Sequence, residues 1–154
     1  VALISGLVFA VSGLASMIAA PLLGKLSDKI GPQKVMLTVL IAAGILFIPQ
    51  AFVKNVRQLM ELRFLLGLAT AGLLPSINTL LKRNTPDEVA GRIFGYNQSA
   101  QFLGTFGGSV LGGQVAALFG IHYVFFVTSA LLLLNAWWVY HSVYKRASVL
   151  ADQL

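Results

Sequence analysis

The sequence predicts an all-α fold, namely a polytopic helical membrane protein with five transmembrane helices. Hydrophobic residues make up 57% of the 154 residues and charged residues only 10%, against roughly 25% charged residues in soluble domains. With a mean hydropathy of +0.83, the chain has more apolar residues than the core of a soluble protein of this size can bury. The charged residues form short clusters, and the apolar runs between them reach the length of about 20 residues that a bilayer requires.

The charges that interrupt the apolar runs place five spans in the chain. The first three spans are expected at residues 1–23, 35–53 and 59–81. From residue 93 to residue 144 there is no Asp, Glu, Lys or Arg, which is too long for one span and suits two. A break at Gly120-Ile121-His122 puts these two spans at 90–119 and 123–144.

We interpret residues 1–154 as a single membrane domain. Because the sequence begins inside an apolar run and the number of spans is odd, we expect the chain to be a piece of a longer polypeptide. The spans differ in character, since the first and fourth are rich in Gly, Ala and Ser, whereas the second and fifth are bulky. Small residues let helices approach closely in lipid. We therefore expect the first and fourth spans at helix interfaces and the second and fifth at the periphery.

The distribution of the 11 Lys and Arg residues predicts the orientation in the membrane. Eight lie on one side, namely Lys25, Lys29, Lys34, Lys82, Arg83, Arg92, Lys145 and Arg146. Three lie on the other side, namely Lys54, Arg57 and Arg63. Cytoplasmic loops carry the excess of basic residues, so the C-terminus is expected in the cytoplasm and Val1 outside. The net charge of +6 is thus explained by topology, and no nucleic acid partner is expected.

Nothing in the sequence indicates an enzyme. Gly24-Lys25 is followed by Leu26, where a phosphate-binding loop would have Ser or Thr. The two histidines, His122 and His141, are too far apart to suggest a metal site. No nucleophile and base occur together either. We expect no enzymatic activity, no cofactor and no metal.

The segment between the first two spans reads Gly24-Lys25-Leu26-Ser27-Asp28-Lys29-Ile30-Gly31-Pro32-Gln33-Lys34. It resembles the signature loop of the major facilitator superfamily, roughly G-x-L-a-D-r-x-G-r-K/R-K/R, which follows the second span of that family and, in a second copy, the eighth. Pro32 and Gln33 depart from this pattern. The residues that match it are Gly24, Leu26, Asp28, Lys29, Gly31 and Lys34.

Further segments resemble the same family. Residues 62–72 are similar to its arginine-containing helix, and residues 91–99 to the C-terminal half of bacterial multidrug efflux proton antiporters. The fourth span is similar to the G-x-x-x-G-P-x-x-G-G motif of drug–proton antiporters, with Ser109 in place of the proline. The residues of this helix-packing motif are Gly104, Gly108, Ser109, Gly112 and Gly113.

The resemblance covers essentially the whole chain. It implies that the five spans are spans eight to twelve of a twelve-helix transporter in a bacterial cytoplasmic membrane, which works by alternating access. The implied partners are the lipid bilayer, a small-molecule substrate, protons and the missing N-terminal half of the same polypeptide. No Asp or Glu lies deep in a span, so the proton-carrying carboxylate is expected in the missing half.

Asp28 is the principal candidate in the signature segment. The resemblance implies that its carboxylate holds a cytoplasmic gate through a cation and a helix N-terminus of the other half. The alternatives are a solvated loop acid or a cap on the second span.

Polar residues on two spans are candidates for the substrate pathway. Arg63, Gly67, Thr70 and Asn78 follow one face of the third span. This stripe could line a cavity, or Arg63 could instead snorkel to the external headgroups. Pro75 is expected to kink the same span.

On the fourth span, Asn97 and Gln101 share a face with Gly104 and Gly108. Amides buried in lipid need partners. This face could contact substrate or the gate, or could form hydrogen bonds between helices.

The sequence thus predicts a secondary active transporter, with proton-coupled efflux of drugs or lipophilic cations as the function that the resemblance favours. One alternative is a metabolite or sugar carrier of the same superfamily, which Ser109 leaves open. An alternative from another class is a non-transporting membrane anchor or assembly subunit, although such a protein has no need of the charged signature segment.

Overall fold

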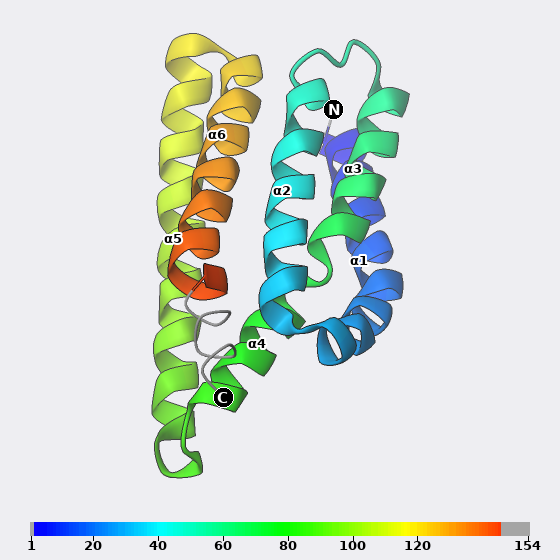
Figure 1. The fold of residues 1–154 in the computed structure, drawn as a ribbon. Coiled ribbons are helices and arrows are strands. Elements are labelled where there is room, and N and C mark those ends of the chain that lie inside the picture. The colour runs from blue at the N-terminus through cyan, green and yellow to red at the C-terminus, as the bar shows by residue number, and fades with distance from the viewer. Residues whose placement is uncertain (1, 146–154) are drawn as a thin grey trace.

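The computed structural model describes residues 2–145. Val1, where the first span was expected to begin, and Arg146, one of the eight basic residues assigned to the cytoplasm, lie outside the described residues. The described residues form six α-helices, of which α3 and α4 belong to one span, with a short 3-10 turn (η1) and a π-helical turn (η2) (Figure 1). Their bounds are α1 Ala2–Ile30, α2 Pro32–Gln50, α3 Val56–Thr70, α4 Leu73–Asn84, η1 Asp87–Val89, α5 Ala90–Phe119, α6 Ile121–Val139 and η2 Tyr140–Tyr144.

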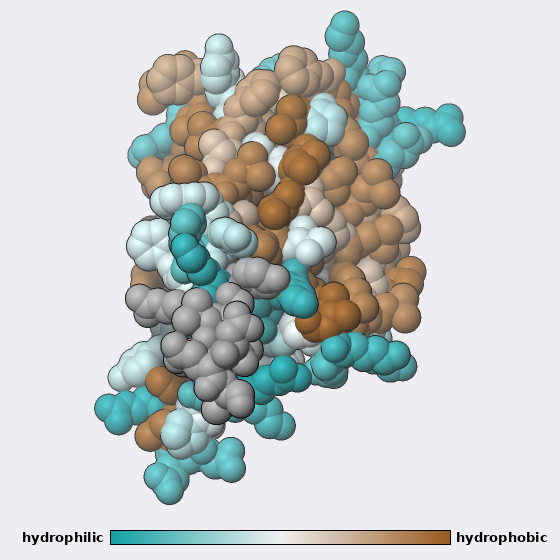
Figure 2. Space-filling model, viewed as in Figure 1, coloured by the Kyte–Doolittle hydropathy of each residue, from teal (hydrophilic) through white to brown (hydrophobic). Residues whose placement is uncertain are grey.

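Five helical segments of the described chain are long and apolar enough to cross a membrane, which confirms the predicted fold class. These segments are Gly6–Ile30, Pro32–Gln50, Val56–Asn84, Asp87–Phe119 and Ile121–Val143. In Figure 2 hydrophobic side chains cover the middle of the visible face, while hydrophilic side chains gather towards its two ends. This distribution is the one that a bilayer requires.

The charged segment between the first two spans is more helical than the sequence suggested. We expected a loop of residues 24–34, but α1 continues to Ile30 and α2 begins at Pro32. Gly31 alone makes the turn, with φ of 100°, a backbone conformation that glycine adopts without steric cost. Pro32 suits the first position of the next helix, because its missing N–H would have no helical partner there.

The third span is broken near its middle. Helix α3 ends at Thr70 and α4 begins at Leu73, close to the kink expected at Pro75. Proline has no N–H to donate to the carbonyl of residue 71, and its ring crowds that carbonyl. The helix therefore stops one turn before Pro75 and restarts in a new direction (Figure 1).

Helices α5 and α6 form a hairpin around Gly120, whose φ is 95°. The fourth span ends at Phe119 as expected, but α6 begins at Ile121, two residues earlier than the fifth span was placed. A glycine at positive φ reverses the chain in one residue, so no loop is needed.

Helix α2 is the central helix of the described chain. It contacts α1, α3, α4 and α6, whereas α5 packs only against α6, η1 and the end of α4 (Figure 1). Within the described residues this arrangement differs from the expectation that the second span is peripheral and the fourth lies at an interface. The reason is topological, because α2 runs between the α1–α3 pair and α6 and buries residues such as Val39, Leu40 and Ala43 against them.

Candidate functional site

The signature segment presents two different faces. Ser27 is fully buried and faces α4, where Ser76 Oγ donates a hydrogen bond of 3.2 Å to Ser27 Oγ. Asp28 and Lys29, which follow directly along the helix, are exposed. Among the described residues the Asp28 carboxylate has no ion-pair or hydrogen-bond partner. The motif thus anchors one side of the α1 terminus in the protein and leaves a free carboxylate on the other.

The position of Asp28 on α1 tests whether this residue caps the second span. The residue that caps α2 is Gly31, and no side chain donates or accepts a capping hydrogen bond there. The interpretation of Asp28 as a cap of the second span is therefore wrong. Asp28 instead lies in the last turn of α1, where the helix dipole disfavours a negative charge by about 0.3–1 kcal/mol. Within the described chain no salt bridge of Asp28 offsets this cost.

Arg63 lies beside aromatic rings of two neighbouring helices. Its guanidinium carbon lies 5.9 Å from the centre of the Phe47 ring on α2 and 6.0 Å from that of Phe125 on α6. The two rings are themselves 6.3 Å apart. Cation–π attraction between a guanidinium and aromatic faces operates over such distances. Arg63 is not among the residues that line the pocket at the break described below, and its snorkelling to the external headgroups stays a prediction.

Gly67 is a packing position between α1 and α3. A Cβ atom on Gly67 would collide with the carbonyl oxygen of Ser12 and would lie 3.0 Å from Ala15 Cβ. The Oγ of Ser16 donates a hydrogen bond of 2.9 Å to the carbonyl oxygen of Gly67. The absence of a side chain therefore lets the two helices touch, and Gly67 does not line the pocket.

A pocket of about 590 Å³ lies where α1 faces the break between α3 and α4. Thr70 and Asn78 line it, so the structure brings together two of the four residues of the predicted stripe. Thr70 Oγ1 donates to the carbonyl oxygen of Leu66 at 2.8 Å, while the exposed Asn78 amide has no partner among the described residues. The full lining consists of Ser16, Ala20, Thr70, Ala71, Leu73, Leu74, Pro75 and Asn78.

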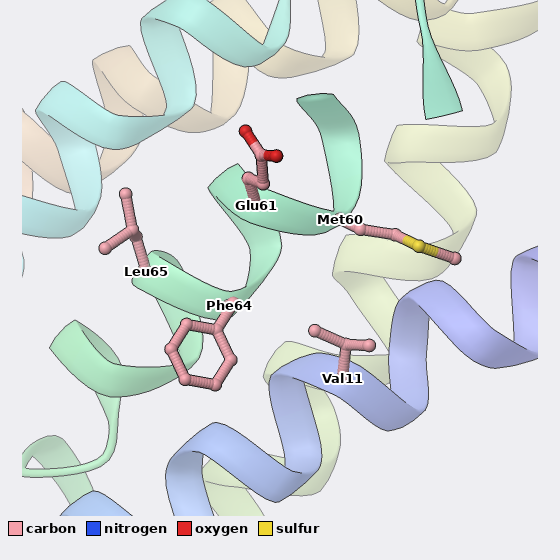
Figure 3. A pocket seen from close by; sticks show the side chains of 5 residues that line it. All are labelled: Val11, Met60, Glu61, Phe64 and Leu65. Carbon is pink, nitrogen blue, oxygen red and sulfur yellow. The ribbon is translucent and has the colours of Figure 1, made fainter. Parts of the chain in front are cut away.

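A second pocket, of about 430 Å³, lies further along the same pair of helices and is shown in Figure 3. Val11 of α1 and Met60, Phe64 and Leu65 of α3 make it almost entirely apolar. Its one charged residue, Glu61, has its carboxylate turned away from Val11 in this view and lies 3.5 Å from Arg57. A ligand site needs a few polar groups that fix orientation, so the pocket at the break is the better candidate.

The polar face of α5 lacks partners within the described chain. Asn97 and Gln101 are half-buried, and neither side-chain amide has a hydrogen-bond partner among the described residues. A Cβ atom would meet nothing within 4 Å at any glycine of the helix-packing motif, namely Gly104, Gly108, Gly112 and Gly113. Ser109 Oγ donates to the carbonyl oxygen of Thr105 at 2.8 Å, within its own helix. The packing role of this motif therefore stays a prediction.

Sequence reasoning missed the serines that join the helices. Besides the bonds of Ser16 and Ser76, Ser129 of α6 donates to the carbonyl oxygen of Gly44 on α2 at 2.7 Å. Hydroxyls in a membrane segment form such bonds between helices because lipid offers no alternative partner. A small polar residue inside an apolar span was the available signal, but the sequence does not say which serines face another helix.

The acidic residues of the described chain lie near the ends of the helices. Asp28 lies in the last turn of α1, Glu61 lies near the start of α3, and Asp87 and Glu88 precede α5. In the described part of the chain, no three His, Asp or Glu side chains come together as a group that could hold a metal ion.

Five apolar helical spans with their charges near the two ends define an integral membrane protein of the helical-bundle class. A family model described as the Major Facilitator Superfamily matches residues 2–152, and the chain belongs to this superfamily. The resemblance seen in the signature segment is thereby confirmed.

Relatives of this chain include proteins named multidrug resistance protein MdtG. The chain is 44% identical to MdtG of Citrobacter koseri over 151 residues, which cover 98% of the chain and 37% of that protein. It is also 44% identical to MdtG of Salmonella schwarzengrund and of Escherichia coli K12 over 146 residues, which cover 95% of the chain and 36% of each relative. The chain thus spans little more than a third of the length of these relatives.

Proposed function

We propose that this chain forms spans eight to twelve of a secondary active transporter that exports drugs or lipophilic cations in exchange for protons. The observation that carries the proposal is the 44% identity, over almost the whole chain, to proteins named for multidrug resistance. The match to the Major Facilitator Superfamily supports transport by alternating access, in which two halves rock about a central site.

The other half of such a transporter would lie against α5. No residue of α5 is buried in the described structure, although its Asn97 and Gln101 amides need hydrogen-bond partners in a membrane. The coverage of 37% of the Citrobacter koseri relative leaves room for an N-terminal half and a further span. Small residues such as Gly104 and Gly108 would let a helix of that half approach closely.

Asp28 would act at the cytoplasmic gate. Its carboxylate is exposed, lacks a partner in the described chain and lies where the helix dipole disfavours it. A cation or a helix N-terminus of the opposite half would supply the missing partner when the gate closes. The excess of basic residues at this end of the bundle supports a cytoplasmic location for this segment and for the C-terminus.

The pocket at the break between α3 and α4 would be part of the substrate pathway. It combines apolar surface with the Thr70 hydroxyl and the Asn78 amide, and no charged residue is among its lining residues. Apolar walls with few polar groups suit lipophilic molecules. None of the acidic residues within the described chain lies deep in a span, so the proton-carrying carboxylate would belong to the other half.

The test uses the full-length transporter in cells that lack their own efflux pumps. We would measure accumulation of a fluorescent lipophilic cation with and without a protonophore, in the wild type, in Asp28→Asn and in Glu61→Gln. Glu61→Gln is the matched control, because it also removes one exposed carboxylate but at the opposite end of the bundle. We expect low accumulation in the wild type and the control, a rise with the protonophore, and a rise in Asp28→Asn.

Equal accumulation in wild-type and empty cells, with the protein present in the membrane, would contradict drug efflux for this cation. Uptake screens with sugars and other metabolites would then test the carrier alternative. Efflux that continues in the presence of the protonophore would contradict proton coupling but not drug export. Efflux that continues in Asp28→Asn would contradict the role of Asp28 at the gate.

A further inference from the structure

Ser27 and Ser76 are both fully buried, although serine is a polar residue in a membrane segment. They lie 49 residues apart in the sequence, and Ser76 Oγ donates a hydrogen bond to Ser27 Oγ at 3.2 Å. A buried hydroxyl that loses its partner keeps the full cost of its desolvation. The pair therefore resists any motion that separates the end of α1 from α4.

Close packing surrounds this hydrogen bond. A Cβ atom on Gly24 would lie 3.9 Å from Pro75 Cβ, and a Cβ atom on Gly72 would lie 3.0 Å from Leu23 Cβ. The last two turns of α1 thus rest on the first turn of α4. We call this contact the α1–α4 seat, and it consists of Leu23, Gly24, Ser27, Gly72, Pro75 and Ser76.

The seat lies directly after the break in the third span. Helix α3 ends at Thr70 and α4 starts at Leu73, so the seat is attached to the part of the span beyond the break. Asp28 is the next residue after Ser27 on α1, and its position and direction follow from the rotation that the seat gives to that turn. Beyond this turn, the single residue Gly31 connects α1 to α2.

The candidate substrate pocket adjoins the seat. Pro75 belongs to both, and Ser16 and Ala20 line the pocket one to two turns before Gly24 on the same helix. A ligand in the pocket therefore contacts both sides of the break and the helix that carries Asp28.

We propose that Ser76 is a positioning residue that acts on Asp28 through Ser27. Helix α4 and the last two turns of α1 move as one unit during transport, so that a change in the direction of α4 at Ala71–Gly72 carries the Asp28 carboxylate with it. This inference rests on the proposed function of the chain. It assigns to the buried serine pair the mechanical link between the substrate pocket and the gate.

The first experiment exploits the absence of cysteine from this sequence. In a full-length transporter without other cysteines, Ser27→Cys and Ser76→Cys are introduced together and joined by a mild oxidant. Their oxygen atoms lie 3.2 Å apart, so the two side chains already face each other, as a disulfide requires. If the two turns move as one unit, dye efflux by the cross-linked protein stays within about twofold of the reduced protein.

Each single-cysteine variant treated with the same oxidant is the matched control. Efflux that stops on cross-linking and returns on reduction would overturn the proposal, because transport would then require the turns to separate. Failure of the pair to cross-link in the membrane would overturn it as well. A wild type that does not export the dye would contradict the proposed function, and the second experiment then tests the link by itself.

The second experiment follows the orientation of the α1 terminus without any transport. A spin label at Lys29, next to Asp28, reports the mobility of this turn, and a label at Arg57 at the opposite end serves as the control. Ser76→Ala is expected to increase the mobility of the label at Lys29 and to leave the label at Arg57 unchanged. Ser76→Thr, which keeps the hydroxyl, is expected to give the wild-type mobility at Lys29. An unchanged Lys29 spectrum in Ser76→Ala, or equal changes at both labels, would refute a positioning role.

Discussion

The guanidinium carbon of Arg63 lies 5.9 Å from the centre of the Phe47 ring, and the Phe125 ring lies at a similar distance of 6.0 Å. The three residues belong to α3, α2 and α6, so one cation joins three helices near one end of the bundle. An arginine inside a span is costly in lipid unless protein or water surrounds it. The two rings shield its charge, and a desolvated cation–π contact contributes about 2 kcal/mol.

Replacing Arg63 with Gln should therefore reduce the stability of the bundle. We expect a loss of about 2 kcal/mol, seen as a lower midpoint when the full-length protein is heated in detergent and followed by size-exclusion chromatography. Arg57→Gln is the control, because the Arg57 side chain is 91% exposed. If Arg63→Gln leaves the midpoint unchanged but abolishes efflux, Arg63 serves the substrate pathway and the aromatic contact is not its main role.

Gly67→Ala should force α1 and α3 apart. The added Cβ would collide with the Ser12 carbonyl oxygen, which belongs to the backbone and cannot rotate away. Overpacking of this kind costs about 1–3 kcal/mol.

Thermal unfolding of the full-length protein measures this loss, with Gly44→Ala for comparison. A Cβ on Gly44 would meet Cδ2 and Cγ of Leu133 at 2.8 and 2.9 Å. These are side-chain atoms, which can move by a change of rotamer, unlike the backbone oxygen of Ser12. We expect Gly67→Ala to lose more thermal stability than Gly44→Ala. A smaller loss in Gly67→Ala than in Gly44→Ala would contradict the close contact of α1 and α3.

Gly108→Leu tests the packing role of the glycines on α5. In the described chain nothing lies within 4 Å of a Cβ on Gly108, so there is open space next to this position among the described spans. If the other half of the transporter covers this face, a leucine costs about 1–3 kcal/mol through overpacking and reduces dye efflux. Ser99→Leu, on the opposite face of the same helix, should leave efflux intact. Normal efflux by Gly108→Leu would show that no helix approaches closely there.

Asn78→Leu tests the pocket at the break in the third span. The Asn78 amide has no partner among the described residues and lines the pocket, so it is free to bind a substrate. Loss of one hydrogen bond of about 0.5–1.5 kcal/mol should raise the dye concentration for half-maximal efflux by roughly two- to tenfold.

The control for Asn78→Leu is Asn84→Leu on the same helix. Asn84 Nδ2 donates to the carbonyl oxygen of Leu80 within α4 and does not line the pocket. A shift of equal size in both variants would point to a general effect on α4 and would count against a substrate contact at Asn78.

The fourth span shows which structural features can be predicted from the local sequence. Its end at Phe119 and the turn at Gly120 could be predicted, because a glycine between two apolar runs makes a turn that needs no other part of the chain. The structure of the signature segment was harder to predict, since the charges of residues 24–34 suggested a loop. Charge does not end a helix, and α1 continues until Gly31 allows the chain to reverse.

By itself the sequence determined that this chain contains five segments apolar and long enough to cross a membrane, where its charges lie and to which family it is similar. These properties follow from hydropathy, charge and motif spacing, which act along the chain. Only the tertiary structure decided that Thr70 and Asn78 share a pocket while Gly67 packs against α1 and Arg63 lies between two rings. Helical periodicity places all four on one face, but the break between α3 and α4 and the contacts with α1, α2 and α6 give each segment its own rotation. The hydrogen bond between Ser27 and Ser76 has the same origin, because residues 49 positions apart meet only when the packing of the helices is fixed.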